Sequence, residues 1–156
     1  MSHASEPYAG RFDGPRHLFA VRVYYEDTDL SGIVYHANYL RWFERARSDM
    51  LRLLGIDQRA AQETGEGVYS VADLSIRYTA SARLDDAVLI ESAALQAGAA
   101  SVTLLQRAFR GQTLLAEAQI RVGFVSPEGR PRRQPAAWRD AFAFLIQPEN
   151  PELPAA

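Results

Sequence analysis

Four apolar segments joined by very short turns follow one long amphipathic helix in this sequence, and this order limits the folds that the chain can adopt. The four segments read as strands at 68–80, 87–95, 100–110 and 113–125, and each alternates apolar and polar residues or is rich in β-branched ones. Strands linked so closely pair antiparallel, because a parallel crossover needs about a dozen residues or more. The sequence therefore predicts one antiparallel sheet.

The helix begins at Asn38 and is stopped by Gly55. Apolar residues recur within it at spacings of three and four, which makes one apolar face: Tyr39, Leu40, Phe43, Ala46, Met50, Leu53 and Leu54. Charged residues fall on the other side: Arg41, Glu44, Arg45, Asp49 and Arg52. With a further strand at Leu18–Tyr25, the prediction is an α+β fold in which about five antiparallel strands pack against one long helix.

The length of 156 residues fits one globular domain, which we place at 17–146 between flexible tails at 1–16 and 147–156. The segment 136–145 could form a final helix or an edge strand. We find no signal peptide and no transmembrane run, and we expect a cytoplasmic protein.

Composition excludes several kinds of chemistry. The net charge is −2, so no positive field points to nucleic acid. All 17 basic residues are Arg, which removes Schiff-base lysine chemistry, and the absence of Cys removes thiol nucleophiles and disulfides.

Three acidic residues, a glycine and a histidine stand between the first strand and the helix, in "YYEDTDLSGIVYHANY". A phosphatase with an Asp nucleophile would need alternating strands and helices, and a calcium loop would need an EF-hand spacing that is absent here. His36 with Asp29 supplies too few ligands for a metal, and His3 and His17 are placed in the N-terminal tail. What remains is a carboxylate near the unpaired N–H groups of a helix start, the two parts needed to hydrolyse an activated acyl group.

The segment "RVYYEDTDLSGIVYHANYLRWFERAR" closely resembles the signature of the hot-dog acyl-CoA thioesterases of the 4-hydroxybenzoyl-CoA thioesterase family, above all the branch associated with the Tol–Pal envelope system. The likeness continues through "YTASARLDD" and "LLAEAQIRVGFVSPEGRPR" and covers roughly 21–135. It implies a hot-dog fold, in which the sheet wraps around the central helix, and hydrolysis of acyl-CoA without a metal or cofactor.

The resemblance also assigns roles to particular residues. It places the catalytic carboxylate at Asp29, as nucleophile or general base, and the N–H that polarises the thioester carbonyl at His36. Tyr25 and the His36 side chain are linked to activity in the Tol–Pal branch. The remaining candidates are substrate-binding residues: Gly32, Val34, Tyr35, Arg83 and Arg132. Glu26 and Asp27 receive no role.

The family pairs subunits into dimers, often tetramers, with the active site at the boundary, so the resemblance implies a homo-dimer or homo-tetramer. Arg83 and Arg132 are candidates for the phosphates of coenzyme A because they sit in turns. Two other functions stay open: a hot-dog dehydratase, and a non-catalytic partner of acyl-carrier protein or phospholipid-synthesis enzymes at the inner membrane.

Overall fold

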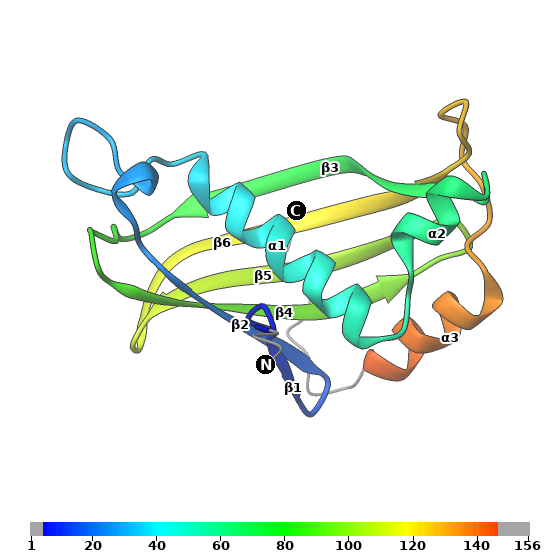
Figure 1. Ribbon diagram of the computed structural model, residues 1–156, viewed down its shortest axis with the longest axis horizontal. Coiled ribbons are helices and arrows are strands. Elements are labelled where there is room, and N and C mark those ends of the chain that lie inside the picture. Colours follow the sequence, from blue (N-terminus) through cyan, green and yellow to red (C-terminus); the bar gives the residue numbers. More distant parts are fainter. Residues whose placement is uncertain (1–4, 147–156) are drawn as a thin grey trace.

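The computed structural model describes residues 5–146, which form one six-stranded antiparallel sheet in the order β1-β2-β4-β5-β6-β3 (Figure 1). Its strands are β1 (Arg11–Asp13), β2 (Arg16–Arg22), β3 (Val68–Tyr78), β4 (Ala87–Ala97), β5 (Ser101–Arg110) and β6 (Thr113–Val125). The tails expected at 1–4 and 147–156 lie outside the described residues.

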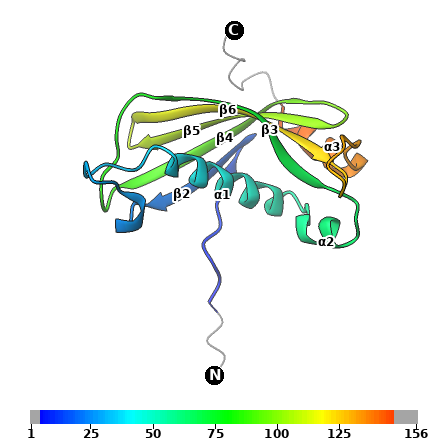
Figure 2. The ribbon, with the colours of Figure 1, turned by 90° about the horizontal axis from the view of Figure 1, so that it is seen from above.

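The long helix α1 (Asn38–Leu53) crosses one face of the sheet, which curves around it (Figure 2). The shorter helices α2 (Gln58–Glu63) and α3 (Ala136–Leu145) lie near the far end of α1, and a 3-10 turn, η1 (Tyr25–Asp27), lies between β2 and α1. The α+β hot-dog prediction is confirmed. Residues 136–145, for which the sequence left both a helix and an edge strand possible, form the helix α3.

The apolar face of α1 supplies the centre of the core. Trp42, Phe43 and Met50 are each no more than 1% exposed and lie in one cluster with sheet residues such as Ile90 and Ile120. Burying a large apolar side chain stabilises a fold by about 1.5–3 kcal/mol, so this face fixes the helix over the sheet. The helix then ends before Gly55, whose φ of +80° suits glycine.

The first strand differs from its prediction at both ends. β2 ends at Arg22, and Tyr25 lies in η1 instead of a strand. The segment expected as a tail also contains β1, which pairs with β2 across a turn in which Gly14 has a φ of +59°. The sequence expectation of a flexible 1–16 therefore does not hold for 11–16, where main-chain pairing orders the chain.

A buried His–Asp pair ties β2 to α1. His17 is fully buried, and its Nε2 lies 2.6 Å from Oδ2 of Asp49, which also accepts a hydrogen bond from the N–H of Gly10. Neither residue lies where the sequence placed it. His17 is in the sheet and not in the tail, and Asp49 is turned inward and not toward solvent, because Nε2 of His17 and the Asp49 carboxylate are hydrogen-bonded in the core. Among the described residues, Nδ1 of His17 has no hydrogen-bond partner.

This pair should make stability depend on pH. Burial lowers the pKa of His17 below its usual 6.5, against the opposing effect of Asp49. The unfolded chain therefore binds the proton at a higher pH than the folded chain, so the stabilisation is complete above pH 6.5 and is lost as pH falls through the folded-state pKa.

We expect the free energy of unfolding to decrease as the pH is lowered from about 7 to about 5. The decrease should be smaller in His17→Gln. Urea titrations of both proteins at several pH values test this. Equal pH slopes in the two proteins would contradict it.

Candidate functional site

The acidic motif forms a small hairpin before α1. Thr28 and Val34 make an isolated antiparallel bridge, the N–H of Asp29 donates to the carbonyl of Ile33 at 2.9 Å, and the N–H of Gly32 donates to the carbonyl of Asp29 at 3.0 Å. Gly32 has a φ of +82°, so the glycine serves this tight loop. The hairpin presents Asp29 near its tip.

Asp29 is a partly exposed carboxylate held by its own loop. Its Oδ1 accepts hydrogen bonds from the N–H of Ser31 at 2.8 Å and from the Ser31 hydroxyl at 2.5 Å. These bonds from Ser31 lower the pKa of Asp29. The carboxylate is therefore ionised at neutral pH.

Asp27, to which the sequence analysis gave no role, is buried at 8% exposure and holds the site together. Its Oδ2 accepts from the N–H of Tyr24 at 2.7 Å, and its Oδ1 accepts from the side-chain amide of Asn38 at 2.6 Å. Asp27 thus joins η1 to the first residue of α1. The sequence carries no signal for this bond, because its partners are eleven residues apart across a loop.

The start of α1 has no side-chain cap. Ala37 occupies the N-cap position, where Ser, Thr, Asp or Asn is usual. Within residues 5–146, the N–H groups of His36 and Ala37 have no hydrogen-bond acceptor. These two N–H groups lie at the end of α1 that carries a partial positive charge. We call the peptide N–H groups of His36 and Ala37 the helix entrance.

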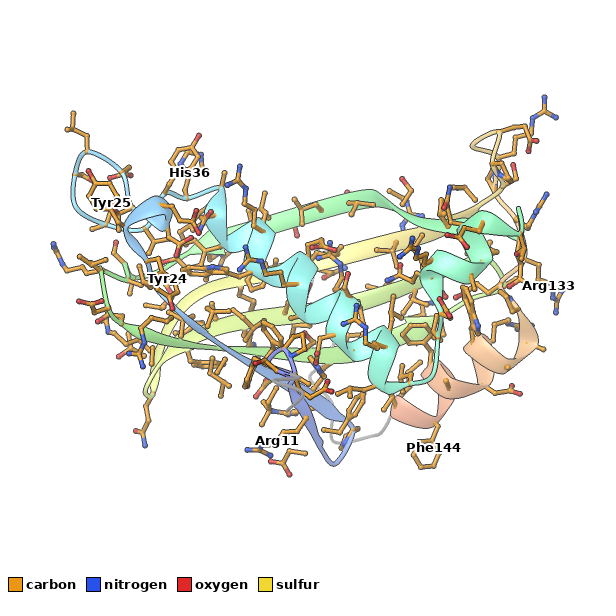
Figure 3. The ribbon with its side chains drawn as sticks, viewed as in Figure 1. Arg11, Tyr24, Tyr25, His36, Arg133 and Phe144 are labelled. Atoms are coloured by element: carbon orange, nitrogen blue, oxygen red, sulfur yellow. The ribbon has the colours of Figure 1, made fainter. Side chains whose placement is uncertain are left out.

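Tyr78, at the end of β3, orients the helix entrance. Its hydroxyl donates to the carbonyl of His36 at 2.8 Å, and the two rings meet edge to face at 6.1 Å. His36 also contacts the ring of Tyr35 at 4.6 Å. The His36 side chain points outward at this end of the molecule (Figure 3).

The other predicted site residues are distributed unevenly. Tyr35 and Arg83 lie at the hairpin: Arg83 bridges to Ile33, and a guanidinium nitrogen lies 3.9 Å from where a side chain on Gly32 would begin. Val34 is only 3% exposed and packs in the core, so its side chain is not available to a ligand.

Among the described residues, the side chains of Tyr25 and Arg132 make no hydrogen bond to Asp29. Tyr25 is 84% exposed, and in the described residues no hydrogen bond or ring contact joins its side chain to Asp29 or His36. Arg132 donates to the carbonyls of Gly65 and Glu66 at the opposite end of the sheet. Within one subunit, Arg132 therefore stabilises the loop that contains Gly65 and Glu66.

The site combines an ionised, accessible carboxylate with unpaired N–H groups at a helix start. Such N–H groups can hold a carbonyl oxygen on which negative charge develops, and the carboxylate can attack the carbonyl carbon or deprotonate water. Over residues 5–146, no three His, Asp or Glu side chains are grouped as metal ligands. The carboxylate and the N–H groups are the two parts that acyl transfer requires.

Known thioesterases are similar to this chain in sequence. Residues 23–146 match the family described as the thioesterase-like superfamily. An acyl-CoA thioesterase YbgC of Haemophilus influenzae is 38% identical over 125 residues, 77% of this chain and 92% of the relative. An acyl-CoA thioester hydrolase YbgC of Escherichia coli is 40% identical over 117 residues, 74% of this chain and 87% of the relative.

Solved structures agree in fold. A probable thioesterase from Bartonella henselae superposes with a TM-score of 0.74 at 33% identity, over 77% of this chain and 99% of that one. A 1,4-dihydroxy-2-naphthoyl-CoA thioesterase from Synechocystis superposes with a TM-score of 0.76 at 24% identity, over 82% of this chain and 96% of that one. At that lower identity the likeness concerns the fold alone.

Proposed function

This chain belongs to the thioesterase-like superfamily, and from that premise we propose that it hydrolyses acyl-CoA thioesters to a free acid and coenzyme A at Asp29 and the helix entrance. The observation that carries the proposal is that an ionised, partly exposed Asp29 and a helix start without a side-chain cap occur in one motif. A side-chain cap contributes about 1 kcal/mol to stability. Its absence leaves these N–H groups available to a substrate.

In the proposed reaction, the thioester carbonyl oxygen accepts a hydrogen bond from the His36 N–H. The Asp29 carboxylate then follows one of two routes. It attacks the carbonyl carbon, the C–S bond breaks, coenzyme A leaves as thiolate, and water hydrolyses the resulting anhydride. Alternatively, Asp29 takes a proton from a water that attacks the same carbon, the C–S bond breaks, and coenzyme A leaves as a thiolate that takes up the proton. Both routes use only protein groups and water. Incorporation of ¹⁸O into Asp29 in a single turnover separates them.

A screen of thiol release across short, long and aromatic acyl-CoA substrates tests the function. A thioesterase forms one free thiol for each thioester consumed. A hot-dog dehydratase, the competing enzyme class, instead forms an enoyl product and releases no thiol. Absence of thiol release from every member of the panel would reject the proposal.

We propose that the active form is at least a dimer joined through β3. This eleven-residue strand is an edge of the sheet, paired only with β6 within the described chain, and it carries half-exposed apolar residues: Val68, Val71, Leu74 and Tyr78. A long apolar edge tends to pair with another strand. Two-fold pairing of two β3 strands would cover it.

Leu74→Glu should dissociate this dimer. Leu74 lies near the middle of β3, so two-fold pairing would bring the two introduced carboxylates close together. Sedimentation velocity should show a dimer or larger species for the parent protein and a monomer for the variant. Leu84→Glu, at an exposed apolar residue outside β3, is the control. A monomeric parent protein would overturn this arrangement.

We also propose a contact between this chain and the phosphates of coenzyme A. The position of Arg83 beside Gly32 supports contact between its guanidinium and a phosphate of coenzyme A. Association with acyl-carrier protein, phospholipid-synthesis enzymes or the Tol–Pal system stays a prediction. None of the helices in the described part of the chain has the length and apolar character needed to span a bilayer.

A further inference from the structure

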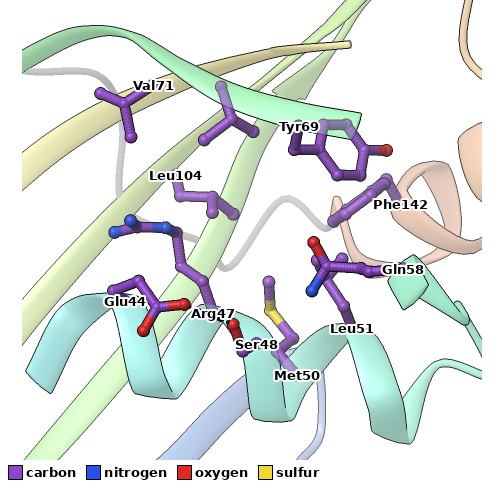
Figure 4. A pocket seen from close by; sticks show the side chains of 11 residues that line it. Glu44, Arg47, Ser48, Met50, Leu51, Gln58, Tyr69, Val71, Leu104 and Phe142 are labelled. Carbon is purple, nitrogen blue, oxygen red and sulfur yellow. Dashed lines mark hydrogen bonds between the residues drawn. The ribbon is translucent and has the colours of Figure 1, made fainter. Parts of the chain in front are cut away.

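A cavity of about 170 Å³ lies beside the second half of α1, between the helix, β3 and α3 (Figure 4). Most of its wall is apolar and includes Met50, Leu104, Val122 and Phe142. Arg47, Glu44 and Ser48 make one side of it polar. The reaction proposed above uses none of these residues.

Arg47 enters this cavity with few partners. One guanidinium nitrogen donates to Oε1 of Gln106 at 2.9 Å, and within residues 5–146 no carboxylate lies within 4.0 Å of it. Gln106 is fixed in this orientation because its amide nitrogen donates to the Phe43 carbonyl and the Ser92 hydroxyl. A guanidinium has five N–H donors, so most of those on Arg47 remain for a ligand.

The other polar groups of the cavity leave room for that ligand. The Glu44 carboxylate accepts a hydrogen bond from the Ser48 hydroxyl at 2.6 Å, which turns both groups toward each other. Burial lowers the pKa of Arg47 and the charge of Glu44 opposes this, so the guanidinium stays charged at neutral pH. A charged donor in a mostly apolar wall favours an oxygen acceptor.

The cavity and Asp29 lie at opposite ends of β3 in one subunit. Tyr69 and Val71 line the cavity, whereas Tyr78 binds the helix entrance. Seven residues of strand separate Val71 from Tyr78, or about 23 Å, too far for a short acyl group. The proposed two-fold antiparallel pairing about the middle of β3 would place the cavity of one subunit beside the helix entrance of the other.

We propose that this cavity receives the far end of the acyl group whose thioester lies at Asp29 of the other subunit, and that Arg47 selects acyl groups with an oxygen at that end. The inference rests on the proposed thioesterase function and on the β3 dimer. A cavity of about 150 Å³ can hold a molecule as large as benzene. The preferred acyl group is therefore short and oxygen-bearing rather than a long alkyl chain.

Three four-carbon substrates test this selection: butyryl-, 4-hydroxybutyryl- and succinyl-CoA. The parent protein should show a kcat/KM about tenfold higher for an oxygen-bearing substrate than for butyryl-CoA, because one charged hydrogen bond contributes about that factor. Arg47→Met should lose that preference, with kcat/KM falling more for the two oxygen-bearing substrates than for butyryl-CoA. The hydroxyl and carboxylate substrates show which oxygen Arg47 prefers.

Arg45→Met, at an exposed arginine that does not line the cavity, is the matched control and should keep the preference. Arg47→Lys keeps a charged donor and should therefore retain part of the preference for oxygen-bearing substrates. It serves as a second variant in case Arg47→Met does not fold. Thermal melting compares all variants. Equal loss on all three substrates, or no preference in the parent protein, overturns the inference while leaving thioester hydrolysis intact. No thiol release from any substrate would instead reject the proposed function.

Discussion

Asp29→Asn should lower thiol release from acyl-CoA substrates by about 10²- to 10⁴-fold, the usual worth of a general base in the transition state. An amide can neither attack the carbonyl carbon nor accept a proton from water at neutral pH. The fold should persist, because Asn keeps an oxygen that can accept from the N–H and hydroxyl of Ser31, and Asp29 is not in the core. The loss should therefore appear in kcat, with the oligomeric state and melting temperature unchanged.

Glu26→Gln is the matched control for this substitution. Glu26 is an exposed carboxylate three residues away, in η1, so its loss changes the local charge by the same amount. We expect this control to keep nearly full activity. Equal activity of Asp29→Asn and Glu26→Gln on every thioester would remove Asp29 from the mechanism.

Asp27→Ala should have the largest effect on stability among the acidic residues of the motif. It leaves the Tyr24 N–H and the buried Asn38 amide without their acceptor. Each buried donor that loses its partner costs about 1–3 kcal/mol. We therefore expect the free energy of unfolding to fall by about 2–4 kcal/mol in urea titrations. Activity should also fall, because the helix entrance is no longer tied to η1.

Glu26→Ala, one residue away and exposed, should change the free energy of unfolding by less than about 0.5 kcal/mol. It separates the buried hydrogen bonds of Asp27 from the effect of charge alone. Similar unfolding midpoints for the two variants would show that the bonds of Asp27 to Tyr24 and Asn38 contribute little.

The helix and the long strands were predictable because burial acts on them over many residues. The period of the apolar residues in α1 and the alternation in β3 and β6 each repeat several times. β1 has only three residues and no repeat, so nothing in its sequence distinguishes it from a tail. The strand-like composition of Val23–Tyr25 was misleading, because the bond from Asp27 to the Tyr24 N–H bends the chain into η1.

The candidate site was predictable in part. A carboxylate before a helix start is a local feature that the sequence shows, whereas the roles of Asp29 and His36 are implied by the family resemblance and stay predictions. Asp27 stands two residues from Asp29 and looks equivalent in sequence, yet only the fold shows that Asp27 is buried. Arg47 is hidden for a related reason. An arginine on a helix resembles a solvated residue until the cavity beside it is known.

A crystal structure with a non-hydrolysable thioester analogue would test the central claim most directly. We expect the carbonyl oxygen of the analogue to lie about 3 Å from the His36 nitrogen. The Asp29 carboxylate should stand beside the carbonyl carbon, or hold a water there. An analogue bound with its carbonyl away from the helix entrance, and with Asp29 out of reach, would contradict the account.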